Sequence, residues 1–208
     1  MRSDNATPGQ RAVPTFISDA RQKQIVDCAV EALAEVGYGR ASLAEIAKRA
    51  GISKGVILYH FKDKESLLET VVEDIYARGF QENFPQTAAE PTFRGMLRRS
   101  IETNVRWIVA HPQWIAALSE IFSNFRRDDG SPRYSFADNA PIIEGVEMIL
   151  SQGQKSGEFR DFPTRPMALT IRAAIDQVPA ALEGFPNVDP DAYAVQLADI
   201  FDAATRRP

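Results

Sequence analysis

The most restrictive feature of this chain is residues 42–64, SLAEIAKRAGISKGVILYHFKDK, in which two short helical patterns flank Gly51. Ser42 with Glu45 three positions later predicts a capping box at the start of the first helix. Gly51 supplies the positive φ with which a helix ends tightly. One face of the first helix is apolar at spacings of three and four: Leu43, Ile46, Ala47 and Ala50.

Ser53 can cap the second helix, whose apolar contacts are predicted to come from Ile57, Leu58 and Phe61. The segment predicts a helix-turn-helix whose second helix is too short to stand alone, so that it presents side chains rather than burying them.

A longer amphipathic pattern precedes this motif and predicts a third helix between Ser18 and Val36, ended by Gly37. Its apolar stripe would cover the two short helices, so residues 18–64 are predicted to form a three-helix head. The stripe consists of Ile25, Cys28, Ala29, Ala32, Leu33 and Val36. The position of Cys28 favours a small core residue over a reactive thiol, and a single cysteine forms no internal disulfide.

Helical patterns continue through the rest of the chain, without an alternating strand pattern or a repeat of fixed period. Pro85 to Pro91 is predicted to be a break after the first of these helices, and Pro179 is expected to kink or end a later one. The expected helices cover residues 64–84, 92–110, 112–125, 141–156, 164–183 and a last segment from 190. The predicted fold is all-α: a three-helix N-terminal helix-turn-helix head followed, over residues 65–208, by a helical bundle.

Charge is divided unevenly along the 208 residues, a length that allows one or two domains with a sizeable core. Residues 1–64 carry ten Lys or Arg against seven Asp or Glu, and the remainder carries fourteen against twenty-one, so net charges of +3 and −7 give −4. A modestly basic head on an acidic body argues against a protein that coats nucleic acid indiscriminately. No apolar run approaches the roughly 20 residues that span a membrane. The polar N-terminus lacks a signal-peptide core, so we expect a cytoplasmic protein with no membrane contact and a flexible arm over residues 1–17.

The stretch SLAEIAKRAGISKGVILYHFKDKESLLE resembles the DNA-binding head of the TetR family of bacterial transcription regulators. The strong part of the resemblance covers roughly residues 20–70, and beyond it only the length, the order of helices and the phrase GEFRDF are similar. The resemblance implies a double-stranded DNA operator as partner. One position departs from the family's pattern, because many members have tyrosine where this chain has Leu58.

The resemblance assigns DNA contacts to residues of the head. At the start of the second short helix, Lys54, Gly55 and Val56 would face base edges or the backbone. Phosphate contacts would come from the remaining residues around the motif: Ser42, Ser53, Tyr59, His60 and Lys64. Each of these residues also has a purely structural alternative. Tyr59 can pack its ring against the first helix, His60 can be a histidine at a helix end whose hydrogen bonds are made within the protein, and Lys54 can be solvated.

The resemblance also implies an effector cavity and a homodimer in the body. Large, soft or polar side chains on the expected helices are candidates for the cavity, although aromatic residues at helical spacing equally suit a core: Met96, Asn104, Trp107, Trp114, Phe122, Phe125 and Met148. Arg172 and Asp176, four residues apart, are either a salt bridge or polar contacts that orient a ligand. The dimer would form from the helices near 141–156 and 164–183, along an apolar seam of Ile142, Val146, Ile149, Ala173 and Val178.

The predicted function is a ligand-responsive, dimeric DNA-binding regulator, a repressor released from its operator by a small, largely apolar effector. An enzyme is disfavoured because the only histidines are His60 and His111, and there is no glycine-rich phosphate loop or metal-spaced cluster. No catalytic residue, metal or cofactor is therefore predicted. A helical protein-interaction module without an effector is the alternative.

Overall fold

The computed structural model describes residues 16–207, and within that range the chain forms ten α-helices and one short 3-10 helix, without a strand. This confirms the predicted all-α class. The arm predicted over residues 1–17 lies outside the described residues, except for Phe16 and Ile17, which begin the first helix. None of the described helices is both long enough and apolar enough to cross a membrane.

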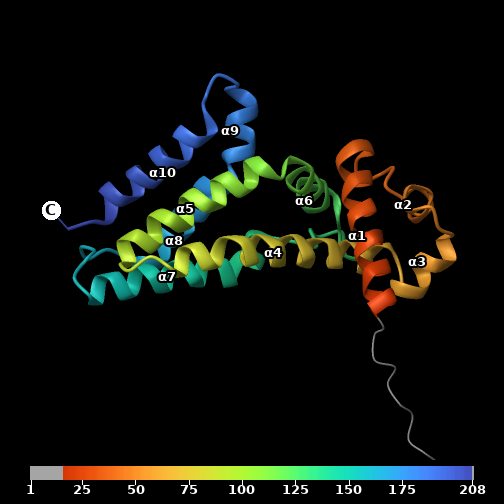
Figure 1. Ribbon diagram of the computed structural model, residues 1–208, viewed down its shortest axis with the longest axis horizontal. Coiled ribbons are helices and arrows are strands. Elements are labelled where there is room, and N and C mark those ends of the chain that lie inside the picture. The colour runs from red at the N-terminus through yellow and green to blue at the C-terminus, as the bar shows by residue number, and fades with distance from the viewer. Residues whose placement is uncertain (1–15, 208) are drawn as a thin grey trace, which may run out of the picture.

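Three helices form the head, which lies at one end of the molecule (Figure 1): α1 (Phe16–Val36), α2 (Leu43–Ala50) and α3 (Lys54–His60). Ser42 and Ser53 each cap the helix that follows by accepting a backbone N–H. The capping box predicted at Ser42 is only half formed, because Glu45 accepts instead from Arg49 Nε at 2.8 Å.

A long helix, α4 (Lys64–Ala88), runs from the head along the body (Figure 1). The predicted break at Pro85 is wrong, since α4 continues through that residue for one more turn. Proline removes one N–H and so one bond to the preceding turn. Gln86 Nε2 donates to the Glu82 carbonyl at 2.9 Å, and Ala89 N donates to the Pro85 carbonyl at 3.1 Å, so the last turn stays closed.

The remaining helices form the bundle around α5. They are α5 (Phe93–Ala110), α6 (Pro112–Asn124), the 3-10 helix η1 (Phe136–Asn139), α7 (Ala140–Lys155), α8 (Thr164–Asp176), α9 (Val178–Gly184) and α10 (Pro190–Thr205). Helix α5 packs against α4, α7 and α10. The chain is interrupted between α8 and α9 immediately before Pro179, as predicted.

The buried apolar residues form two separate cores. The first core joins the head to the first half of α4 and to α6; its fully buried members include Ile25, Leu33, Ile46, Ile57, Leu68 and Ile121. The second core joins α5 to α7, α8, α9 and α10; its fully buried members include Ile101, Val105, Leu150, Phe159, Ala168 and Val178. The first core therefore extends past residue 64, as far as Ile75 of α4.

Candidate nucleic-acid interface and internal cavity

The turn between α2 and α3 holds α3 on the outside of the head. Gly51 ends α2 at φ 64°, where its N–H reaches carbonyls of the preceding turn, and the N–H of Ile52 donates to the Ala47 carbonyl at 3.0 Å. Ile57 then anchors α3, since its side chain is fully buried in the first core. One short helix is thereby fixed by a single buried side chain, and its other faces remain open.

The outer faces of α3 carry the residues predicted to meet DNA. Lys54 and Gly55 are exposed, and Val56 and His60 are half-buried. Tyr59 is 83% exposed, and its ring lies edge-on to the His60 ring, with 5.1 Å between the ring centres. The alternative in which Tyr59 packs against the first helix is therefore wrong.

Leu58 departs from the sequence expectation, because it was assigned to the apolar contacts of α3 and is 44% exposed. A seven-residue helix makes about two turns, so residues adjacent to the anchor Ile57 point well away from the core. The exposed side of α3 thus combines a cation at Lys54 with apolar and aromatic surface at Leu58 and Tyr59.

Lys64 holds the head together rather than projecting freely from it. Its Nζ donates to the Tyr38 carbonyl at 2.7 Å and lies 4.2 Å from the centre of the Tyr38 ring. Burial lowers the pKa of Lys64. The N–H of the same residue, Tyr38, donates to Glu120 Oε2 of α6 at 2.7 Å. The turn after α1 is therefore held between the start of α4 and α6.

A cavity of about 830 Å³ lies between the two cores. Its walls include Val72 and Phe122, which pack in or against the first core, and Met96 and Ile149, which pack in or against the second. Six residues predicted to contact an effector line it: Met96, Asn104, Trp107, Phe122, Met148 and Arg172.

Three other residues predicted to contact an effector lie outside the cavity wall. Trp114 stacks on His111 at 4.3 Å and lies under the Arg78 guanidinium. Phe125 is buried in the first core. Asp176 lies behind Arg172 and forms a salt bridge with it at 2.5 Å, which supports the structural reading of this pair. Burial raises the pKa of Asp176 against the opposing effect of Arg172.

Several cavity residues were missed by the sequence analysis: Tyr76, Asn83, Thr87, Arg133, Tyr134 and Asn139. On α4 a signal was available, because Asn83 and Thr87 continue the stripe of Val72 and Tyr76 at helical spacings. The loop residues gave none, since Arg133 and Tyr134 belong to a segment dense in turn-forming residues, for which we expect a loop with a short helical piece. Burial raises the pKa of Tyr134 to about 12, so its hydroxyl stays protonated in the cavity wall at neutral pH.

The apolar seam predicted for a dimer is contradicted in part. Val146, Ile149 and Val178 are buried in the second core of the protomer, and Ile142 lines the cavity. The helical period places these side chains inward, and a single sequence does not distinguish a protomer core from a subunit seam. Of the predicted seam only Ala173 is exposed.

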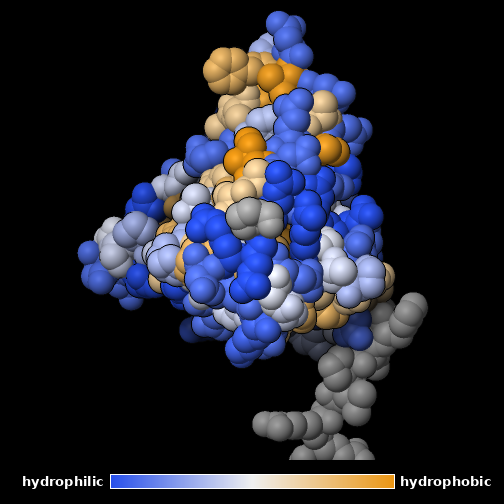
Figure 2. All heavy atoms as spheres, turned by 90° about the vertical axis from the view of Figure 1, so that its left-hand side faces the viewer, coloured by the Kyte–Doolittle hydropathy of each residue, from blue (hydrophilic) through white to orange (hydrophobic). Residues whose placement is uncertain are grey.

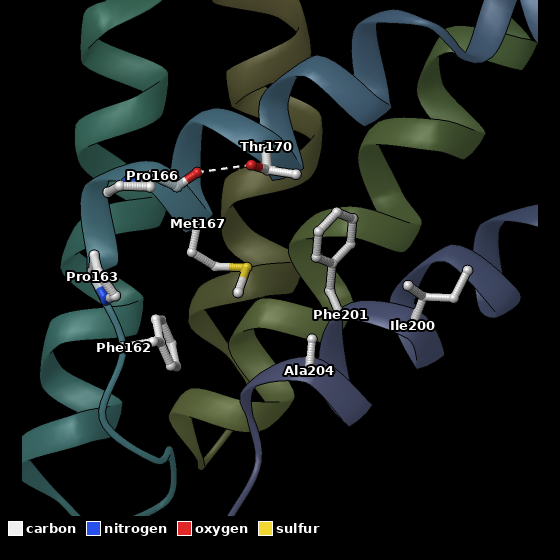
Figure 3. Close-up of a pocket in the computed structure, with 8 residues that line it drawn as sticks. All are labelled: Phe162, Pro163, Pro166, Met167, Thr170, Ile200, Phe201 and Ala204. Carbon is white, nitrogen blue, oxygen red and sulfur yellow. Dashed lines mark hydrogen bonds between the residues drawn. The ribbon is translucent and has the colours of Figure 1, made fainter.

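An apolar groove of about 350 Å³ lies instead between α8 and α10. In Figure 3, Met167 of α8 and Phe201 of α10 approach one another across it, with Phe162 below and Ile200 beside them. Ile200 is 62% exposed. Viewed from the end opposite the head, hydrophobic side chains gather in the upper part of the molecule, where α9 and α10 lie, above a mostly hydrophilic lower part (Figure 2).

Among the residues that the structure describes, no three His, Cys, Asp or Glu side chains are grouped so that they could hold a metal ion. Cys28 is partly buried against the first core, and burial raises the pKa of its thiol. A thiol held in its protonated form is a poor nucleophile, in keeping with a packing role.

Comparison with known proteins identifies the head first. Residues 25–71 match the model of bacterial regulatory proteins of the tetR family. The HTH-type transcriptional regulator BetI of Escherichia coli O157:H7 is 32% identical over 157 residues, which cover 61% of this chain and 80% of that protein. The match to BetI of Escherichia coli strain E24377A is shorter, 102 residues, and the chain spans about half (52%) of that relative's length.

Solved structures share the whole fold at low identity. The fatty acid degradation regulator FadR of Bacillus halodurans superposes with a TM-score of 0.74 at 20% identity, over 90% of this chain and 97% of that one. FadR of Bacillus subtilis, solved in complex with stearoyl-CoA, gives a TM-score of 0.73 at 21% identity, over 87% and 97%. The chain therefore belongs to the tetR family of bacterial regulatory proteins and is a DNA-binding transcriptional regulator, not an enzyme.

Proposed function

We propose that this regulator is a dimeric repressor that leaves its operator when a small, largely apolar effector enters the cavity. The observation that carries the proposal is the position of the cavity, which has one wall on the core that holds the head and the other wall on the core of the bundle. An effector that binds better to one relative placement of the two cores shifts the protein toward that placement.

The DNA-reading surface in this proposal is the exposed side of α3 with the caps around it. Lys54, Gly55 and Val56 enter the major groove at the N-terminal end of α3, as in other helix-turn-helix proteins. Tyr59 and His60 approach the phosphates, as do the exposed hydroxyls of Ser42 and Ser53 at helix starts, where the dipole favours an anion. Lys64 acts by positioning the turn at Tyr38, in keeping with its 2.7 Å bond there.

The effector site in this proposal is the cavity itself. Its volume falls within the range of small-molecule sites, and its wall is mainly apolar. Bacillus subtilis FadR, which shares the fold, was solved with stearoyl-CoA, a ligand with a long apolar chain. That neighbour supports a ligand with an apolar part in this architecture.

Helix α6 provides a direct connection from the cavity to the head. Phe122 lines the cavity, and Glu120 on the same helix accepts the Tyr38 N–H at 2.7 Å. Tyr38 is also bonded to Lys64 at the start of α4. A displacement of α6 by an effector would therefore reach the turn before α2 and the base of α4 together. Residues 18–64 serve in this proposal as the DNA-binding domain, and residues 65–208 as the effector and dimerisation domain.

A second copy of the chain is proposed to pack on the outer faces of α8 and α10, in place of the predicted pairing of α7 with α8. The groove between α8 and α10 is apolar, and the exposed Ile200 at its edge suits insertion into the same groove of a partner. Small exposed residues on both faces, such as Ala173 and Ala203, allow helices to approach closely. A twofold arrangement would present two heads to half-sites about 34–36 Å apart, or a multiple of this.

The test is DNA binding by variants of α3 on the duplex upstream of the protein's own gene. Lys54→Ala and Tyr59→Ala should each weaken binding about tenfold in a gel shift, because each removes a contact worth about 1–3 kcal/mol. Lys155→Ala, at the exposed end of α7, is the matched control and should bind as the wild type does. Unchanged affinity of both α3 variants, or a strictly monomeric protein by light scattering, would contradict the proposal.

A further inference from the structure

Two polar side chains without a hydrogen-bond partner among the described residues lie in the cavity wall. Asn83 and Thr87, one turn apart on α4, are 9% and 8% exposed, and both line the cavity. Neither side chain forms a hydrogen bond with another residue in the range 16–207, in contrast to the buried Thr103 and Thr205, whose hydroxyls donate to carbonyls of their own helices. Among the described residues, the one side-chain atom that is fully enclosed and lacks a partner is Trp107 Nε1. The polar atoms of Asn83 and Thr87 therefore remain accessible from the cavity, where a hydrogen-bonding ligand can meet them.

Further neutral polar groups lie opposite them on α5. Gly79 of α4 packs directly on the Trp107 ring of α5. Because these two helices are antiparallel neighbours, moving one or two turns along α4 to Asn83 and Thr87 corresponds to moving back along α5 toward Asn104 and Ser100. Both α5 residues line the cavity, and Asn104 Nδ2 donates to the Ser100 carbonyl at 2.8 Å, which leaves the Asn104 amide oxygen available. The cavity therefore contains a zone of uncharged hydrogen-bonding groups between α4 and α5.

The charged groups of the cavity lie nearer the head, and both cations among them are already paired. Arg133 binds Glu69 at 2.7 Å, and Arg172 binds Asp176 at 2.5 Å. The other ionised groups in the wall are the carboxylates Glu73 and Asp138. Because a carboxylate already balances the charge of each arginine, an anionic ligand would find no uncompensated cation in this wall.

An entirely apolar ligand would also fit the cavity poorly. It would exclude water from Asn83 and Thr87 without offering hydrogen bonds of its own, and a buried polar group left unpaired is costly. The apolar part of a ligand is served instead by the rest of the wall: Phe80, Phe84, Met96, Met148 and Ile149.

We propose that the effector is an uncharged molecule with an apolar body and a neutral hydrogen-bonding group, such as a hydroxyl or a ketone, which meets Asn83 and Thr87. This deepens the proposed function, because it assigns a ligand class to the effector cavity. The amide of Asn83 both donates and accepts, and the hydroxyl of Thr87 does the same, so either an alcohol or a carbonyl finds a partner.

The test uses five probes built on a chain of eight carbons: octanol, octan-2-one, octane, octanoate and octyltrimethylammonium. Binding is followed by tryptophan fluorescence, since the chain has two tryptophans and Trp107 lines the cavity. Octanol and octan-2-one should bind about tenfold more tightly than the other three, because each good hydrogen bond contributes on the order of one decade in affinity. Tightest binding by octanoate or by the ammonium probe would overturn the inference, as would no response to any probe.

Variants then locate the hydrogen-bonding group. Asn83→Leu, which keeps the side-chain size, should lower the affinity for octanol about tenfold and remove the preference over octane. Thr87→Val should do the same to a smaller extent. Asn187→Leu, on the exposed loop before α10, is the matched control and should retain the preference. Circular dichroism and thermal unfolding verify that the variants fold, and an undiminished preference in folded Asn83→Leu would overturn the inference.

The outcome is separable from that of the proposed function. Probe binding is measured without DNA, and operator binding is measured without probe. Loss of operator binding by the wild type would contradict the repressor proposal while leaving the ligand class intact. Operator binding with a preference for a charged probe would contradict only the ligand class.

Discussion

The two cores of this protein differ in the kind of side chain that they bury. All buried polar side chains of the described residues lie in the body, beyond the first core: Asn83, Thr87, Thr103, Asn139, Asp202 and Thr205. The first core is closed by apolar residues alone, with Ile25, Leu33, Ile46 and Ile57 fully buried. A purely apolar, closely packed core holds the head as one rigid unit. The body instead includes a cavity with polar groups in its wall.

This contrast also bears on the proposed coupling between the cavity and the head. The first core includes α6 and the first half of α4, so the head packs on two helices that line the cavity. In the proposed function, these packed helices connect the effector to the DNA-binding head. The following variants test this division, from the largest expected effect to the smallest.

Gly153→Ala should destabilise the second core by about 3 kcal/mol, the upper range for overpacking. A Cβ at Gly153 would overlap the fully buried Phe159 ring and would lie 3.1 Å from Phe93 Cβ. A Cβ at Gly145 on the same helix would have no other atom within 4 Å. Gly145→Ala should therefore stabilise the folded protein by about 1 kcal/mol through helix propensity. Urea unfolding measures both. Equal stabilities for the two variants would show that α7 is not packed as described.

Asp202→Asn should cost about 2 kcal/mol at pH 7, because it weakens charge-assisted bonds from Arg94 of α5, one of them 2.7 Å long. These bonds hold the pKa of Asp202 below its usual value. The stability they provide is therefore complete above about pH 4, the unfolded pKa of aspartate, and is lost as the pH falls through the folded pKa.

Unfolding by urea between pH 7 and pH 2 measures this effect. The wild type should lose stability in acid more steeply than Asp202→Asn, so that the two curves converge at low pH. Asp199→Asn is the control: Asp199 is 58% exposed beside Arg98, and its loss should change stability by less than about 0.5 kcal/mol. Parallel curves for the wild type and Asp202→Asn would contradict the role of Asp202.

Glu120→Gln should have the smallest effect, about 1 kcal/mol, confined to the contact between α6 and the head. It replaces a charged acceptor of the Tyr38 N–H by a neutral one. The Tyr38 amide should exchange with solvent roughly fivefold faster, as hydrogen exchange by NMR can measure. Glu31→Gln, exposed on α1, is the control. Unchanged protection at Tyr38 would mean that α6 does not hold this turn.

Local sequence was sufficient for the head. Two capping serines, a glycine at a helix end and one apolar face predicted α2 and α3 almost to the residue, because each signal acts within a single turn. The same reasoning failed at Leu58. Its helical spacing predicted a side chain that faces the core, but α3 is so short that this side chain is exposed. It failed again at Pro85, where the surroundings of a helix end tolerate the lost bond.

The candidate cavity was predictable only in part. Helix periodicity identified side chains such as Trp107 and Phe122 that line it, but gave Trp114 and Phe125 the same expectation, although they pack elsewhere. Periodicity reports that a residue faces inward and not what it faces. Arg133 and Tyr134 reach the cavity from a loop, which has no period at all.

The sequence by itself determined the all-α class, the helix-turn-helix and, apart from Leu58, the residues that α3 presents, since these depend on contacts between residues close in the chain. Only the tertiary structure decided that the first core extends into α4 and α6, that Val146 and Ile149 belong to the protomer core, and that Asn83 and Thr87 line a cavity. These outcomes depend on which helix faces pack together. That choice is made by the summed burial of surfaces far apart in the chain, and no local pattern encodes it.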